Sequence, residues 1–196
     1  MNNNRIAALG DSVTKGFDGF ENLQENYPNY LSQIINLSVD NFGVNGATIV
    51  NDLTNEINDV NWKQYNQCIL FIGTNDYGHN PNNLNEVTSK LKQDLNLIYQ
   101  FNSQIIISAI LPLNRYDQKQ NAANKRRFAN YTFNELLDAL AQTYRTYTIP
   151  VLDWRKLYPN FINDNNYQSK YNDKHVHPTA QTYYQIANKI ADFIKK

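Results

Sequence analysis

The chain has 196 residues, of which 18 are Lys or Arg and 18 are Asp or Glu, so that its formal net charge is zero. This length suits one domain with a sizeable core, and we expect a single domain over residues 1–196. A chain without net charge has no global field to attract nucleic acid or an anionic membrane, so neither is expected as a partner. The expected partner is a small molecule.

Cysteine usage and the N-terminal segment bear on the compartment. Cys68 is the only cysteine, and it lies in an apolar run, so no intramolecular disulfide can form. The first residues lead into an apolar run without the apolar core of a signal peptide, and no run reaches transmembrane length. We therefore expect a cytoplasmic protein without a membrane span, although a secreted protein that has lost its signal peptide would have the same sequence. The sequence does not reveal the oligomeric state.

Short apolar runs alternate along the chain with longer segments of helical period. This alternation predicts an α/β domain with a mostly parallel sheet. Five runs are expected as strands, over residues 6–9, 38–42, 68–72, 105–111 and 148–152. Three segments place apolar side chains on one helix face, over residues 84–98, 129–144 and 180–194. Asn80-Pro81 is the predicted cap and first turn of the first of these helices.

Two polar stretches, residues 112–121 and 158–174, are expected as loops. The first directly follows the fourth strand, and loops at the carboxyl ends of parallel strands line the ligand crevice, so we expect it to shape a substrate pocket. Within it, Arg115 and Tyr116 either meet a polar or anionic leaving group or are solvated. Lys125-Arg126-Arg127 is interpreted as a solvated helix face, because three cations make too small a patch for a phosphate site.

Ser12 stands in the motif Gly10-Asp11-Ser12, directly after the first predicted strand. A strand-to-helix turn there would expose the serine hydroxyl, which needs a base within hydrogen-bond reach to act as a nucleophile. His177, at the start of the last predicted helix, is the preferred base. His175 is the alternative, because two residues spaced by two positions point to the same side of an extended segment. His79 is interpreted as a loop histidine.

Acyl transfer also needs donors aimed at the oxygen that becomes negative. Three are available: the backbone N–H groups of Ser12 and Gly46, and the carboxamide of Asn75. Each position also has an ordinary interpretation as a helix cap or turn residue. Because each follows a different predicted strand, we expect all three at one edge of the sheet, where they would form an oxyanion hole. Asp11 is interpreted as structural.

Together these segments resemble the SGNH hydrolase family, also called GDSL esterases and lipases. The resemblance rests on residues 8–12, 41–48, 73–76 and 177–179, which occur in the order of the family's blocks. It implies a flavodoxin-like fold, a three-layer α/β/α sandwich, around the five-stranded parallel sheet. It also implies hydrolysis of esters without a metal or cofactor, with Ser12, Gly46 and Asn75 forming the oxyanion hole and His177 as the histidine of the site.

One position departs from the family pattern. The family usually has its triad aspartate three residues before the histidine, where this chain has Lys174, and Asp173 stands one residue further back. A bulged loop could still bring Asp173 to His177. Otherwise a backbone carbonyl would orient the ring, or His175 would serve as the base.

The expected function is that of a serine esterase acting on small acyl esters, with short-chain or acetyl groups and acetylated sugars among the candidates. A thioesterase or a lysophospholipase of the same fold is an alternative. A further alternative is a binding module that has lost its triad acid, for which Lys174 is the best support.

Overall fold

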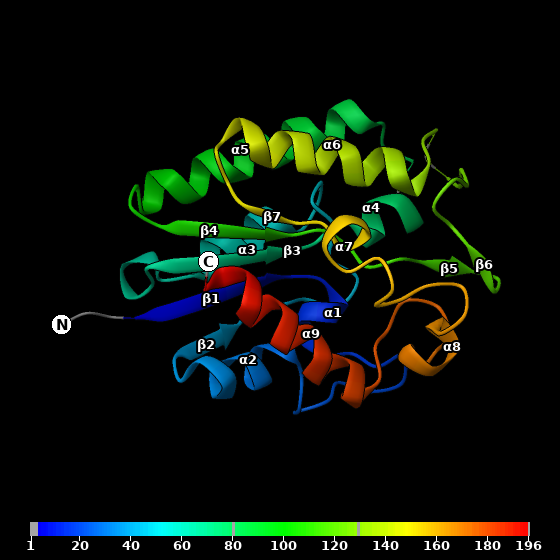
Figure 1. Ribbon diagram of the computed structural model, residues 1–196. Coiled ribbons are helices and arrows are strands. Elements are labelled where there is room, and N and C mark those ends of the chain that lie inside the picture. Colours follow the sequence, from blue (N-terminus) through cyan, green and yellow to red (C-terminus); the bar gives the residue numbers. More distant parts are fainter. Residues whose placement is uncertain (1–3, 80, 129, 196) are drawn as a thin grey trace.

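The computed structural model describes residues 4–79, 81–128 and 130–195. Its centre is a parallel sheet of five strands in the order β2-β1-β3-β4-β7. The strands are β1 (Arg5–Gly10), β2 (Ser38–Asn41), β3 (Gln67–Phe71), β4 (Ile106–Ile110) and β7 (Val151–Leu152). Helices cover both faces of the sheet, as Figure 1 shows. The predicted three-layer α/β/α sandwich and its five-stranded parallel sheet are confirmed.

The two helical layers belong to different parts of the chain. One face of the sheet is covered by α3 (Leu53–Asp59), α5 (Leu84–Phe101) and α6 (Phe133–Thr146), and the other by α2 (Tyr27–Ile35) and α9 (Ala180–Ile194). Shorter elements are α1 (Ser12–Lys15), η1 (Trp62–Gln64), α4 (Thr74–Gly78), α7 (Trp154–Leu157) and α8 (Tyr167–Lys170). None of the helices in these described ranges is long and apolar enough to cross a membrane.

The central strands β1, β3 and β4 are largely apolar because both of their faces are buried. In β1, Ala7 and Leu9 pack into the cluster under α5 and α6, whereas Ile6 and Ala8 pack into the cluster under α2 and α9. Cys68 in β3 is buried, as its apolar surroundings predict. The sheet therefore contributes side chains to two hydrophobic cores, one on each of its faces.

The three predicted helices are present, but two of them begin later than expected. The first begins at Leu84, where Asn83 and Glu86 form a capping box, so the predicted cap at Asn80-Pro81 is wrong; Asn80 itself lies outside the described residues. The second begins at Phe133 after a Thr132 cap, and Ala129 also lies outside the described residues. The reciprocal hydrogen bonds of a capping box fix these starts more strongly than proline does.

The late start of α6 overturns the interpretation of Lys125-Arg126-Arg127 as a helix face. These three residues lie in the loop that precedes the helix. The two stretches expected as loops also contain regular structure. The first holds the antiparallel hairpin of β5 (Tyr116–Asp117) and β6 (Gln120–Asn121), and the second holds α8.

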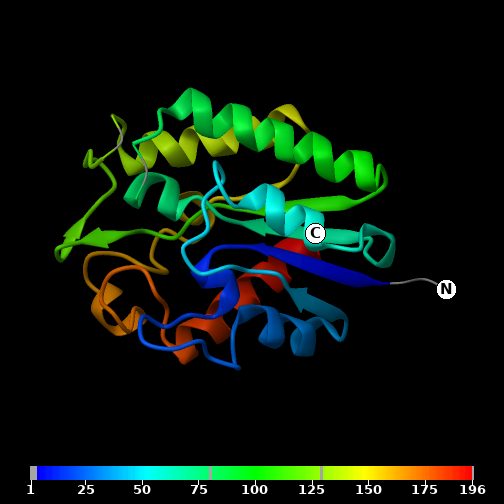
Figure 2. The ribbon, with the colours of Figure 1, turned by 180° about the vertical axis from the view of Figure 1, so that it is seen from behind.

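All five parallel strands end at the same edge of the sheet. In Figure 1 this edge is on the right, where α1, α4, the β5–β6 hairpin and α8 gather, and Figure 2 shows the same edge from behind, on the left. Ligands of open α/β sheets bind at this edge. The fold thus brings the segments after β1, β2 and β3 together with the loop before α9.

Gly10 ends β1 at the point where the chain leaves the sheet. Its φ is +152°, and a Cβ atom there would lie 2.1 Å from the carbonyl oxygen of Phe71 and 2.5 Å from Oγ1 of Thr14. Gly46, in the loop after β2, has a φ of +80° but no heavy atom within 4 Å of the same position. Only the first glycine is required by close packing.

We expect Gly10→Ala to lower the free energy of unfolding by about 3 kcal/mol or more, because strain and overlap with strand β3 add. Gly46→Ala is the matched control and should cost only about 1–2 kcal/mol, from its backbone conformation. Urea unfolding of both variants measures the difference. Equal losses would show that the tight contact at β3 is absent.

Candidate active site

Ser12 is placed by the turn between β1 and α1. Asp11 caps the short helix, because its carboxylate accepts a hydrogen bond of 2.9 Å from the backbone N–H of Val13. The Ser12 side chain is largely buried, and its Oγ lies 3.0 Å from Nε2 of His177. Residues 165 positions apart therefore meet, as the choice of His177 as the base for Ser12 predicted.

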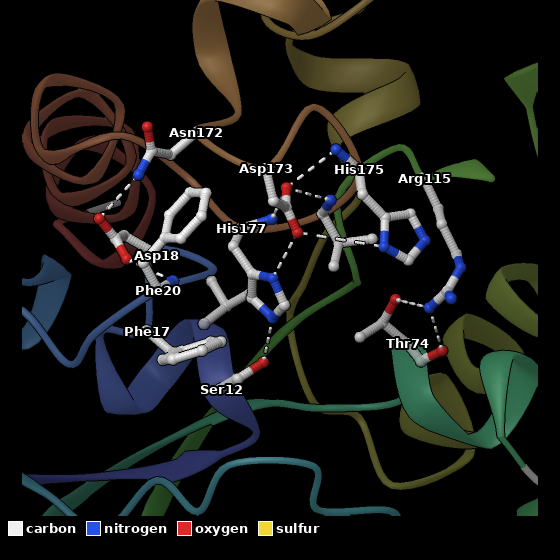
Figure 3. A network of polar contacts seen from close by, with 12 residues as sticks. Ser12, Phe17, Asp18, Phe20, Thr74, Arg115, Asn172, Asp173, His175 and His177 are labelled. Carbon is white, nitrogen blue, oxygen red and sulfur yellow. Dashed lines mark hydrogen bonds and ion pairs between the residues drawn. The ribbon is translucent and has the colours of Figure 1, made fainter. Parts of the chain in front are cut away.

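His177 comes from the loop before α9 and lies between Ser12 and Asp173 (Figure 3). Its Nδ1 is 2.6 Å from Oδ2 of Asp173. A carboxylate can only accept a hydrogen bond, so Nδ1 carries the proton and Nε2 of the neutral ring is left to accept from the serine hydroxyl. The edge of the Phe17 ring packs against the imidazole, with centroids 4.9 Å apart.

The loop absorbs one extra residue between Asp173 and His177. Lys174 takes a left-handed conformation, with φ of +57°, and the other oxygen of Asp173 accepts the backbone N–H groups of His175, Val176 and His177 at 2.8, 3.1 and 3.1 Å. Asp173 rather than a backbone carbonyl thus contacts the His177 ring. Burial raises the pKa of this carboxyl, but the hydrogen bond and charge of His177 outweigh it, so the pKa is below its ordinary value.

His175 faces away from Ser12, toward the β5–β6 hairpin. Its Nε2 lies 2.5 Å from Oδ1 of Asp117, and its backbone carbonyl accepts from the backbone N–H of Tyr116 at 3.1 Å. The expectation that the rings of His175 and His177 point to one side is wrong, because residues 172–176 bend around the Asp173 carboxylate and do not form an extended segment. His79 is exposed at the end of α4.

The three predicted oxyanion donors lie on neighbouring segments. The loop after β2 is tied to the end of β1 by the hydrogen bond from Val44 N–H to the Gly10 carbonyl, 2.9 Å long. Asn75, in the first turn of α4, donates from Nδ2 to the carbonyl of Ala47 at 3.0 Å. Within the ranges that the structure describes, the backbone N–H groups of Ser12 and Gly46 have no protein acceptor. They are available to a ligand.

The family assignment follows from a comparison with protein-family models. Residues 8–184 match the model of the GDSL-like lipase/acylhydrolase family. The chain belongs to this family. Its members are ester hydrolases, and the match covers all the residues discussed above. No curated protein matches the chain.

Solved structures support the fold of this GDSL-like hydrolase. A lipase/acylhydrolase from Enterococcus faecalis superposes with a TM-score of 0.71 at 19% identity, covering 98% of this chain and 95% of that one. An acetyl xylan esterase gives 0.72 at 17% identity, with 96% and 98% covered. The psychrotrophic esterase EstA from Pseudoalteromonas gives 0.70 at 16% identity, with 98% and 97% covered. At such identities the likeness shows the fold alone.

Asp117, hydrogen-bonded to Arg115, contacts from the hairpin side the loop that carries Asp173 and His177. Arg115 is 1% exposed, and its guanidinium donates to Asp117 at 2.9 Å and to the carbonyl of Thr74 at 3.2 Å, so it is neither solvated nor available to a leaving group. Asp117 also accepts from Arg127 at 2.8 Å. Burial raises the pKa of Asp117, but the hydrogen bond from His175 and the two arginines outweigh it and bring the pKa to about 2. The sequence did not identify Asp117 as a site residue. The one sequence feature that points to it is its position between the cationic residues Arg115 and Lys119.

A buried carboxyl group supports the turn that presents Ser12. Oε2 of Glu56, in α3, accepts the backbone N–H of Gly10 at 2.8 Å, and the side chain is almost fully buried. Burial raises the pKa of Glu56 to about 9, although the hydrogen bond from Gly10 acts in the opposite direction. The group is therefore protonated at neutral pH and serves the fold as a neutral acceptor.

This protonation makes stability depend on pH. Between the ordinary pKa of 4.5 and the folded value of about 9, the native state keeps a proton that the unfolded chain has lost. The free energy of unfolding should therefore fall as pH rises from about 5 to about 9. We expect Glu56→Gln to show a shallower fall, because its amide oxygen still accepts from Gly10 but does not titrate. Urea unfolding across this range checks the slope, and equal slopes in both proteins would contradict the account.

Proposed function

We propose that the protein is a serine esterase that cleaves small acyl esters through an acyl-enzyme, with Ser12 as nucleophile, His177 as base and Asp173 as the acid that orients it. The observation that carries the proposal is the continuous hydrogen-bond chain from the Ser12 hydroxyl through the His177 ring to Asp173, with distances of 3.0 and 2.6 Å. This is the arrangement that lets a serine hydroxyl lose its proton as it attacks.

The first half of the reaction forms the acyl-enzyme. His177 takes the proton of Ser12 as Oγ bonds to the acyl carbon, and the carbonyl oxygen becomes negative. The anionic carboxylate of Asp173 stabilises the imidazolium that results. His177 then gives its proton to the leaving alcohol, and the acyl group stays on Ser12.

The second half releases the acid. Water loses a proton to His177 and attacks the acyl carbon, and Ser12 leaves with that proton. In both halves the negative oxygen would accept from the backbone N–H groups of Ser12 and Gly46 and from Asn75. Loss of one such donor typically costs about 2.7–4 kcal/mol of transition-state stabilisation.

A small hollow lies next to the turn that carries Ser12, and we propose that it takes the acyl group. An enclosed hollow lined by Asp11, Val13, Thr74, Leu113 and Val176, among others, has a volume of only about 10 Å³. Such a volume holds about one water-sized group. A long acyl chain would require these side chains to move, so acetyl and other short esters are the preferred substrates.

The contact between Asp173 and His177 also supports an enzyme over a binding module. A binding module that has lost its acid would leave Nδ1 of the imidazole without a carboxylate. Here the acid is supplied from one residue earlier in the chain than the family pattern predicts. Thioesterase and lysophospholipase activities would use the same three residues, and substrate profiling separates them from esterase activity.

We expect Ser12→Ala and Asp173→Asn to lower the turnover of p-nitrophenyl acetate by about 10³–10⁴-fold, because the first removes the nucleophile and the second removes the charge that orients His177. Lys174→Ala is the matched control from the position where the family has its acid, and it should keep most of the activity. Rates of folded, purified variants check this. Equal rates for the wild type and Ser12→Ala would contradict the proposed function.

A further inference from the structure

A groove lies between the β5–β6 hairpin and the loop that carries Asp173 and His177. A hollow of about 390 Å³ is lined by the hairpin, by Arg127 and by Asp173, Lys174 and His175. A second hollow, of about 240 Å³, shares Asp117, Gln118 and Arg127 with the first. We call the two together the basic groove. It begins at Asp173, the residue whose carboxylate contacts the His177 ring.

The groove gathers positively charged side chains, although the chain as a whole has a formal net charge of zero. Its five exposed cations are Lys119, Lys125, Arg126, Arg127 and Lys174. Of these, only Arg127 has an ion pair within the described residues, with Asp117. Lys125 and Arg126 instead donate to the neutral side chains of Gln120 and Asn130.

The carboxylates of the groove are already engaged. Asp117 accepts from Arg115, Arg127 and His175, and Asp173 accepts from His177 and the backbone of its own loop. The five cations outnumber these two carboxylates, so the groove keeps a net positive charge. A cleft lined by one sign of charge attracts ligands of the opposite sign.

Two of the lysines that line the groove lie at residues with a left-handed backbone conformation. Lys119 sits in the hairpin turn with φ of +64°, and Lys174 follows Asp173 with φ of +57°. The hydrogen bond between His175 and Asp117 joins these two segments. The backbone segments that carry the two lysines are therefore tied to each other and to the loop of His177.

The geometry points to a substrate whose alcohol portion is anionic, carrying a carboxylate or a phosphate that the basic groove binds. This inference rests on the proposed function, in which His177 gives its proton to the leaving alcohol. The alcohol therefore leaves beside Nε2 of His177, and the groove begins at Asp173, on the opposite edge of the same ring, so an alcohol portion that extends past the imidazole would bring its anion to the groove. The small hollow by Val13 would then take the acyl group. The lining is made largely of polar and charged side chains, which suits a hydrophilic anion such as an acidic sugar.

The test compares acetyl esters that differ only in charge: an acetylated methyl hexoside, the corresponding hexuronate and the corresponding hexose phosphate. We expect kcat/KM to be about tenfold higher for at least one anionic ester than for the neutral one at low salt. This advantage should shrink as salt is added, because the Debye length falls from about 30 Å at 0.01 M to about 8 Å at 0.15 M. A preference for the hexuronate or for the phosphate identifies which anion the groove takes.

Substitutions locate the effect. The double variant Lys125→Gln/Arg126→Gln should lower the ratio of kcat/KM between anionic and neutral esters several-fold. Lys63→Gln removes an exposed cation in η1, before the amino end of β3, and should leave that ratio at the wild-type value. A wild-type ratio near one that does not respond to salt, or an unchanged ratio in the double variant, would overturn the inference.

The two proposals can fail separately. If p-nitrophenyl acetate is not cleaved in a Ser12-dependent way, the esterase assignment fails, and the anionic-substrate inference fails with it. If neutral and anionic esters are cleaved equally well through Ser12, only the role of the basic groove is refuted.

Discussion

The rest of the site depends on the hydrogen bonds that the Asp173 carboxylate accepts. One of its oxygens accepts three backbone N–H groups of its own loop, and the other accepts from Nδ1 of His177. The first set of bonds holds the loop that contains one residue more than the family pattern. The second fixes the ring so that its free nitrogen meets Ser12. One partly buried carboxylate thus shapes the loop and orients the proposed base.

Much of the fold could be predicted from the sequence, because its causes are local. Strands buried on both faces leave apolar runs, and α5 and α9 leave apolar stripes of helical period. The positions of Ser12, Gly46 and Asn75 after successive strands follow from the parallel sheet. The start of α5 was missed although Asn83 and Glu86 carry a capping-box pattern, because Asn80-Pro81 offered a competing local signal.

The parts that could not be predicted depend on tertiary contacts. The bulged loop that brings Asp173 to His177 was one of the predicted alternatives, but the choice among them depended on the positive φ of Lys174, which lysine gives no reason to expect. His175 is turned away by its bond to Asp117, a residue 58 positions earlier. Arg115 is buried by partners from α4 and β5 that no local pattern connects. The basic groove could be recognised only once the loop before α6 and the hairpin had been placed side by side.

The most direct test of the account is to label the protein with a fluorophosphonate and map the modified peptide by mass spectrometry. Such a reagent traps a serine whose proton is removed by a neighbouring base. The account predicts modification at Ser12 alone, slowed strongly by His177→Ala. Modification at another residue, or equal labelling of the wild type and Ser12→Ala, would contradict the claim that Ser12 is the activated nucleophile.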